Sequence, residues 1–214
     1  MTGYGQLFAY DTKLDSFIVI PSLNAGTIAS LAKDKTGNIY VSASEMIFLM
    51  DAGLTRILPL DITINGGQPV SHNAILPLLV DSKQRLWVGC NDGSVTCYDP
   101  KTKAQQHYTA NVLTGGIVRV IIEDKQQRIW FGTENGILTL NPDGSSILTQ
   151  KGYNTDGLSD NAVYCIISDR QNNIWIGSYF GGVDYLSIQK PQFHHFNPSP
   201  VSGELKARIP RNLV

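Results

Sequence analysis

The hydrophobic positions of the chain fall in short runs separated by polar turns. Between residues 161 and 186, an apolar run leads to a polar turn and then to a second run that closes on Trp175-Ile176-Gly177; a glycine pair and a third short run follow. These runs are too short for helices and are rich in Val, Ile, Trp and Tyr, and Gly or Asp-Gly separates them at strand spacing. The pattern therefore predicts short antiparallel strands joined by tight turns.

The same order of runs recurs upstream, which predicts a tandem repeat. The copies are residues 73–98, with Asp81 and Trp87-Val88-Gly89; residues 116–140, with Asp124 and Trp130-Phe131-Gly132; and a decayed copy, 26–50, with Asp34 and Tyr40-Val41-Ser42. In each copy the aromatic lies six residues after the aspartate, and successive aspartates (34, 81, 124, 169) are 47, 43 and 45 residues apart. A repeat of this length made of short strands is typical of β-propeller blades, whereas a β-sandwich would not repeat these residues in phase.

Each repeat is expected to form four antiparallel strands. We predict two-residue hairpin turns at Asp92-Gly93 and Asn135-Gly136, since both pairs suit a left-handed backbone. Weaker outer strands are predicted at 105–109 and 145–150. The fold class is therefore all-β, built of four-stranded β-propeller blades.

The repeats also predict how the chain is divided. Residues 1–25 supply outer strands of a partial blade, complete blades span 26–62, 63–110, 111–150 and 151–197, and residues 198–214 begin a truncated one. We interpret the chain as a fragment of a larger propeller of about seven blades. Exposed blade faces and strand edges would then favour pairing with a second copy, as a homodimer, or with the remainder of the parent propeller.

The residues shared by the repeats are expected to be scaffold. Each aspartate can accept backbone N–H bonds of the following turn, each tryptophan can pack blade against blade, and each glycine allows close backbone approach. The residues assigned to this structural class are Asp81, Asp124, Asp169, Trp87, Trp130, Trp175, Gly89, Gly132 and Gly177.

Composition narrows the function classes. The net charge of −1 and the 16% content of charged residues give no basic field for nucleic acid, and no run of 18 apolar residues predicts a membrane span. No secretion signal is recognised at the start of the chain. Three cysteines are too few for a disulfide framework; Cys90 and Cys97 are expected opposite Val95 and Val88, and all three as small buried residues rather than ligands.

Candidate ligand residues are those that differ between repeats at one position. Five residues before each aspartate stand Ala29, Leu76, Arg119 and Tyr164, and Arg119 is a charge within an apolar run. A buried unpaired charge costs several kcal/mol, to order of magnitude, so Arg119 must reach water or a partner. The hairpin tips add hydrogen-bonding and stacking groups, and a connector adds a histidine: Asn91, Asp92, Glu134, Asn135, Tyr179, Phe180 and His72. The alternative is that Arg119 pairs with an Asp or Glu of a neighbouring blade and that the tips are merely solvated.

The motif Gly-Leu-Ser-x-Asn-x-Val…Asp…Asn-x-Ile-Trp-Ile-Gly…Gly-Gly-Val, carried by residues 157–186, resembles the propeller repeat of two-component regulators. The first repeat departs most, with Tyr40 for Trp and Ser42 for Gly. The resemblance implies a segment of the periplasmic sensor region of a Bacteroidetes hybrid two-component sensor kinase. It further implies a non-catalytic propeller that senses oligosaccharides, without cofactor or metal, while the parent chain carries the kinase and its membrane anchor.

Two other classes stay open. A propeller lyase resembling the streptogramin lyases would need a histidine converging with acidic or metal-binding residues on the central face, where the sequence offers His72 at most. His194 and His195 fall in an outer strand, where surface placement is expected. A protein-interaction scaffold of WD-repeat type is less favoured, because Trp-Ile-Gly does not match the Trp-Asp dipeptide. None of the nucleotide-binding, nucleophile-elbow or zinc-protease motifs occurs.

Overall fold

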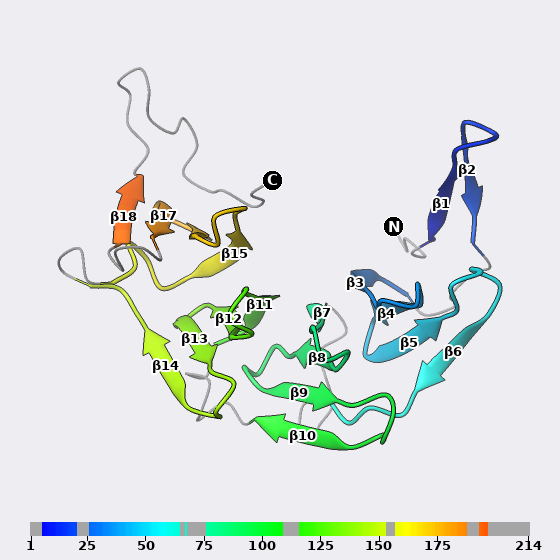
Figure 1. Cartoon of the computed structure of the whole chain (residues 1–214), viewed down its shortest axis with the longest axis horizontal. Coiled ribbons are helices and arrows are strands. Elements are labelled where there is room, and N and C mark those ends of the chain that lie inside the picture. The colour runs from blue at the N-terminus through cyan, green and yellow to red at the C-terminus, as the bar shows by residue number, and fades with distance from the viewer. Residues whose placement is uncertain are drawn as a thin grey trace.

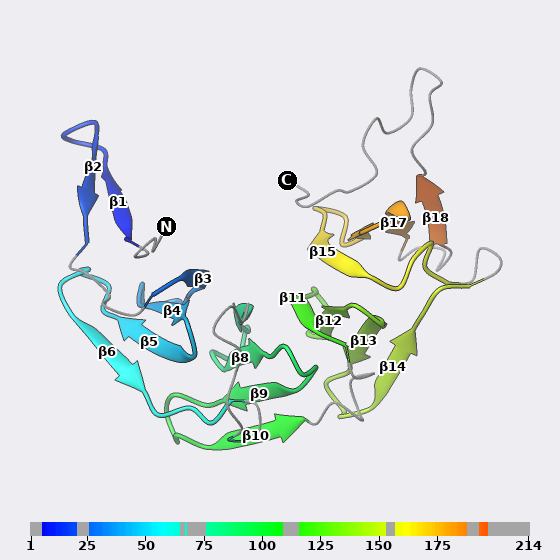
Figure 2. The same cartoon turned by 180° about the vertical axis from the view of Figure 1, so that it is seen from behind.

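The computed structural model describes residues 6–20, 26–64, 67, 76–108, 116–152 and 157–187, together with the backbone of 193–196. Throughout these residues the chain is all-β, and the predicted fold class is confirmed. The strands form one two-stranded and four four-stranded antiparallel sheets. The sheets follow one another along a curved arc, with the first strand of each on the inner side and the fourth on the outer side (Figure 1; Figure 2).

Each four-stranded sheet uses consecutive strands in chain order. The hairpin β1–β2 comes first, and the sheets β3–β6, β7–β10, β11–β14 and β15–β18 follow. The strands are β1 Phe8–Asp11, β2 Ser16–Val19, β3 Ile28–Lys33, β4 Ile39–Ala43, β5 Met46–Met50, β6 Ile57–Leu60, β7 Leu78–Val80, β8 Leu86–Gly89, β9 Val95–Tyr98, β10 Gln105–Tyr108, β11 Val118–Glu123, β12 Ile129–Thr133, β13 Gly136–Leu140, β14 Ser146–Thr149, β15 Val163–Ser168, β16 Ile174–Ser178, β17 Gly182–Leu186 and β18 Phe193–Phe196.

The hairpin turns differ from the prediction. The turn at 91–93 is a three-residue loop, because Cys90 N–H donates to Ser94 O and Gly89 pairs with Val95. In the next sheet Thr133 pairs with Gly136, so the two loop residues are 134 and 135, one earlier than predicted. The first loop contains Gly93 and the second is followed by Gly136, and both glycines have positive φ. A glycine in this conformation is compatible with a three-residue loop with a bulge as well as with a two-residue turn.

This shift also corrects the register expected at the cysteines. Trp87 pairs with Cys97 and Val88 pairs with Thr96, whereas the prediction placed Val88 opposite Cys97 and Cys90 opposite Val95. All three cysteines are buried, as expected of small core residues.

The aspartate of each repeat caps the turn after the first strand, as predicted. Asp124 Oδ1 accepts the backbone N–H groups of Gln126 at 2.9 Å and Arg128 at 3.0 Å. In Asp169, partial burial acts to raise the pKa, but hydrogen bonds from Asn173, Trp175 and the turn backbone outweigh it, so the pKa lies below its ordinary value. The carboxylate therefore stays ionised.

The second carboxylate oxygen explains the constant spacing of six residues. The indole Nε1–H donates to Oδ2 of the aspartate at 2.9 Å for Trp87 and Asp81, at 2.8 Å for Trp130 and Asp124, and at 3.2 Å for Trp175 and Asp169. Each indole therefore keeps its polar atom bonded while its ring is placed between sheets, a link that sequence reasoning missed.

The aromatic plates pack one sheet against the next, as predicted, for Trp87 and Trp130. Trp87 packs in one buried cluster with Val118, Ile121 and Phe131 of the following sheet, its ring centroid 5.6 Å from that of Phe131. Trp130 packs with Val163 and Ile166 in the same way, and Tyr40 does so with Leu78 in the decayed repeat. The ring of Trp175 contacts that of Tyr185 in its own sheet, with the centroids 4.6 Å apart.

The glycine after each aromatic is required by side chains rather than by a backbone approach. A Cβ on Gly132 would lie 2.6 Å from Val120 and 2.8 Å from Val163, and one on Gly89 would lie 2.6 Å from Val118. Contacts this short are prohibitive, so the side chains of the inner strands occupy the space. Gly177 holds the equivalent register position, paired with Cys165 and Val183. In the first repeat Ser42 replaces the glycine, and its hydroxyl donates to Leu76 O of the next sheet at 2.8 Å.

Candidate functional site

The variable position chosen from the sequence is a β-bulge. The pairing of β11 with β12 skips from Val118 to Val120, so Arg119 has no partner in the ladder. The pairing of β15 with β16 skips Tyr164, and that of β3 with β4 skips Ala29. A bulge leaves one residue outside the ladder and redirects its side chain, which explains how this position can hold unlike residues.

The bulge residues of neighbouring sheets meet. The Arg119 guanidinium carbon lies 4.9 Å from the centroid of the Tyr164 ring, in cation–π geometry. Arg119 Nη2 also donates to Glu134 Oε1 at the tip of its own sheet, forming an ion pair. Arg119 thus pairs with an acid, but the prediction that this acid comes from a neighbouring blade is wrong, because Glu134 belongs to the same sheet. The neighbouring sheet supplies the aromatic ring that the cation faces.

Two more aromatic rings extend this contact. Tyr164 lies 5.2 Å from Tyr179 between ring centroids, and Tyr179 lies 4.5 Å from Phe180 in edge-to-face geometry. Phe180 is 71% exposed, so the series ends in solvent. We call these five residues, Arg119, Glu134, Tyr164, Tyr179 and Phe180, the tip cluster; they come from β11, β15 and the loops that follow β12 and β16 (Figure 1).

The tip cluster combines a fixed cation, a carboxylate and aromatic faces, which suits a polyhydroxylated ring: C–H faces stack on aromatics and hydroxyl groups bond the ionised atoms. Arg119 Nε and Asn91 Oδ1 are buried atoms without a hydrogen-bond partner among the described residues. Buried polar atoms are normally bonded, so both are notable at a candidate binding site. Asn91 follows Cys90, whose carbonyl accepts from Val118 N–H, next to Arg119.

The structure separates the remaining candidates from this cluster. Asp92 Oδ1 accepts from the backbone and hydroxyl of Ser94, which makes it a turn cap. Asn135 lies in the loop beside Glu134, with its N–H bonded to Thr133 Oγ1. His72, and the side chains of His194 and His195, lie outside the described residues.

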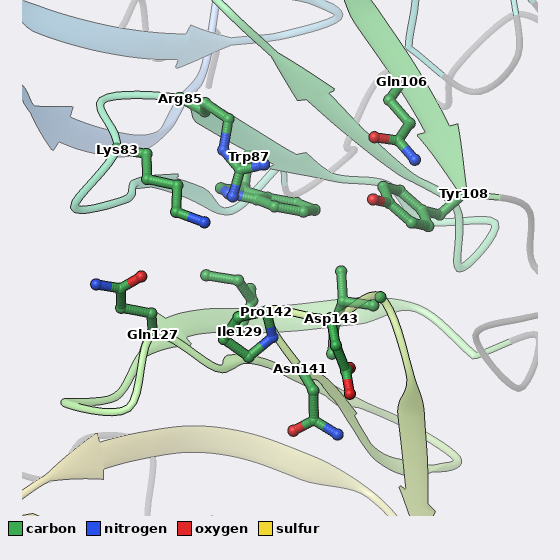
Figure 3. Close-up of a pocket in the computed structure, with 12 residues that line it drawn as sticks. Lys83, Arg85, Trp87, Gln106, Tyr108, Gln127, Ile129, Asn141, Pro142 and Asp143 are labelled. Atoms are coloured by element: carbon green, nitrogen blue, oxygen red, sulfur yellow. The ribbon is translucent and has the colours of Figure 1, made fainter.

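Sequence reasoning missed a groove between the sheets β7–β10 and β11–β14 (Figure 3). It has a volume of about 280 Å³ and is lined by Lys83, Arg85, Trp87, Gln106, Tyr108, Gln127, Ile129, Leu140, Asn141, Pro142, Asp143 and Gly144. Lys83, Arg85 and Gln127 lie in or next to the turns after the repeat aspartates, residues 141–144 lie in the turn between β13 and β14, and Gln106 and Tyr108 lie in β10. In the sequence, the only indication of this groove was that Gln106 and Tyr108 differ from the residues at the same positions of other repeats.

Four-stranded sheets stacked through aromatic plates around an arc define a protein of the β-propeller class. Residues 112–135 and 157–180 match the family model described as two component regulator propeller. The matched segments lie in the third and fourth of the four repeats. No curated protein matches the chain.

Solved structures of the same fold include sensor domains and lyases. The extracellular domain of BT4673, described as a hybrid two component system from B. thetaiotaomicron, superimposes with a TM-score of 0.70 at 20% identity, over 87% of this chain and 27% of that one. The corresponding domain of BT3049 gives 0.75 at 18% identity, over 96% and 27%. A virginiamycin B lyase from Staphylococcus aureus gives 0.64 at 14% identity, over 93% and 62%.

At these identities the similarities establish the fold, and this chain spans about a quarter of the sensor domains that it matches. Among the residues whose placement is described, no helix has the length and apolarity to cross a membrane. Their one histidine with a described side chain, His107, lies on the outer strand β10, with Nδ1 3.1 Å from Thr96 Oγ1.

Proposed function

We propose that the chain is a non-catalytic, ligand-binding propeller segment of an extracytoplasmic sensor in a hybrid two-component system, and that its ligand is an oligosaccharide. The repeat family and the fold shared with extracellular sensor domains support the sensor role. Signalling would pass to the remainder of the parent chain, including its kinase, through changed packing of the blades or association with a second copy.

The observation that carries the ligand assignment is the tip cluster. Arg119 over Tyr164, continued by Tyr179 to the exposed Phe180, forms a polar and aromatic surface that the blade scaffold does not need. The shared structural residues bond and pack within the sheets instead. The residues at equivalent bulges differ from repeat to repeat. Such differences are expected of a surface that is adapted to one ligand, because a bulge residue is not fixed by the strand pairing.

A matched pair of phenylalanines tests the proposal. Phe180 and Phe17 are each 71% exposed, but Phe17 lies in β2, on a different sheet from the tip cluster. In a binding screen with di- to hexasaccharides, Phe180→Ala should weaken binding about tenfold, near 1.4 kcal/mol, while Phe17→Ala leaves it unchanged. Saccharide binding that survives the combined loss of Arg119, Tyr164 and Tyr179 would refute the site.

A further inference from the structure

The four residues before β15, 159–162, bond to the loop after β16, which carries the exposed end of the tip cluster. We call residues 159–162 the connector. Ser159 Oγ donates to Gly181 O at 3.0 Å, and Asp160 Oδ2 accepts from Phe180 N–H at 3.1 Å. Two side chains of the connector therefore hold two successive residues of the loop.

The backbone of the connector adds a bond that another repeat shares. Tyr179 N–H donates to Ala162 O at 2.8 Å, as Glu134 N–H does to Ile117 O at 3.2 Å in the third repeat. The carboxylate bond to Phe180 is not shared in this way. In the sequence, the position of Asp160, four residues before the bulge position, is occupied in the other repeats by Ala25, His72 and Gly115. No other repeat has a carboxylate there.

The connector also bonds to the tip of the third sheet. Asn161 O accepts from Gly136 N–H at 2.8 Å, directly after the loop that contains Glu134. Asn161 Oδ1 accepts from Lys151 N–H at 2.6 Å. The connector is thus bonded both to the sheet that carries Arg119 and Glu134 and to the loop that carries the exposed aromatic rings.

A buried carboxylate fixes the connector in place. Asp184 of β17 is 0% exposed, and its Oδ2 accepts from Ser159 N–H at 3.0 Å. A Cβ on Gly181 would lie 2.8 Å from Asp160 Cβ, so the loop and the connector are in direct contact. Buried polar groups are normally hydrogen-bonded. The bond to Asp184 therefore determines where Ser159 lies, and with it the neighbouring Asp160.

Phe180 depends on such support because its ring lies mostly in solvent. The side chain is 71% exposed, and its ring contacts that of Tyr179 edge-to-face, with centroids 4.5 Å apart. Ordering an exposed side chain when a ligand binds lowers the affinity by roughly two- to tenfold. A residue that orders the loop beforehand removes this loss.

We propose that Asp160 is a positioning residue of the tip cluster. By accepting the Phe180 N–H, it holds Tyr179 and Phe180 in place for a sugar ring, beside Tyr164 and Arg119. This role rests on the oligosaccharide binding proposed above. It assigns part of the affinity to a carboxylate that acts through Phe180.

The first test compares two substitutions of Asp160 by calorimetric titration with di- to hexasaccharides. Asp160→Ala should weaken binding about fivefold. Asp160→Asn should bind as the wild type does, because its amide oxygen can accept the same N–H. The control is Asp99→Ala, which removes a turn cap of the second sheet that accepts from Lys101 N–H at 2.8 Å. It should leave the affinity unchanged. Equal losses for Asp160→Ala and Asp160→Asn, or for Asp160→Ala and Asp99→Ala, would overturn the proposal.

A double-mutant cycle separates positioning from a general structural effect. If Asp160 acts through the Phe180 ring, Asp160→Ala should cause no further loss of affinity in a Phe180→Ala background. Additive losses would show that Asp160 does not act through this ring.

A measurement without ligand distinguishes this role from the proposed function. The amide hydrogen of Phe180, followed by NMR, should exchange about tenfold faster in Asp160→Ala and at the wild-type rate in Asp160→Asn. Unchanged exchange in Asp160→Ala would overturn the role of Asp160 even if saccharides bind. Failure of the wild type to bind any saccharide would instead refute the proposed function, and the exchange rates would still decide whether Asp160 holds the loop.

Discussion

Replacing Asp124 by alanine should destabilise the protein far more than replacing a half-buried turn aspartate. Asp124 is buried, and its Oδ2 accepts from Trp130 Nε1 at 2.8 Å and from Arg128 Nε at 2.6 Å. Without it, the indole N–H of a residue that is only 4% exposed has no acceptor, at about 1–3 kcal/mol. Arg128 is partly exposed, so its lost ion pair adds about 1 kcal/mol or less.

Turn N–H groups that lose Oδ1 can bond water, so each contributes little. We therefore expect the free energy of unfolding, measured by urea denaturation, to fall by about 2–4 kcal/mol. The control is Asp99→Ala: Asp99 is only half-buried and caps its turn by accepting from Lys101 N–H at 2.8 Å, so the loss should be about 1 kcal/mol. Equal losses for the two variants would show that the aspartate acts only as a turn cap and that the bond to tryptophan adds nothing.

Two other properties follow from the core. Burial raises the pKa of Tyr40 to about 12 and that of Cys97 to about 11. In the unfolded chain both groups release their protons at lower pH. The stability that they contribute is therefore complete below about pH 9 and is lost between about pH 9 and 12. Tyrosinate absorbance during alkaline unfolding should show this loss, Cys97→Ala should reduce its lower part and Tyr40→Phe its upper part; unchanged profiles would contradict the assignment. Gly132→Ala would place a Cβ 2.6 Å from Val120 and should lower the free energy of unfolding, measured in urea, by about 1–3 kcal/mol. The control Gly53→Ala places its Cβ near the Asp51 and Thr55 side chains and should lower this free energy by less. Equal losses would show that crowding at Gly132 is not the cause.

The fold could be predicted from the periodic sequence because every repeat has the same pattern of strands, turns and recurring residues. The aspartate recurs in phase and caps a turn in each repeat, and the aromatic six residues later packs against the next sheet at Tyr40, Trp87 and Trp130. The hairpin details were wrong by one residue, since Asp-Gly fits two-residue and three-residue loops alike and the choice is made by the strands on either side.

The candidate site was partly within reach of the sequence. Residue differences at one repeat position led to Arg119 and Tyr164, which the structure brings together across a seam. The partner of Arg119 was not predicted, because Glu134 lies 15 residues away along the chain and the strand pairing of β11 with β12 brings it near. The groove was not predicted either, because residues of two different sheets, far apart in the sequence, line it.

The bulges also bear on how such a protein can change its specificity. Arg119, Tyr164 and Ala29 stand outside the pairing of their strands, so another side chain there disturbs neither strand alignment nor the neighbouring indole. Three of the four blades thus carry one residue outside the strand pairing at this position, whereas the second has the buried core residue Leu76 there. A new ligand could be accommodated by substituting one of these three residues at a time, and designed variants with altered recognition should start from these positions.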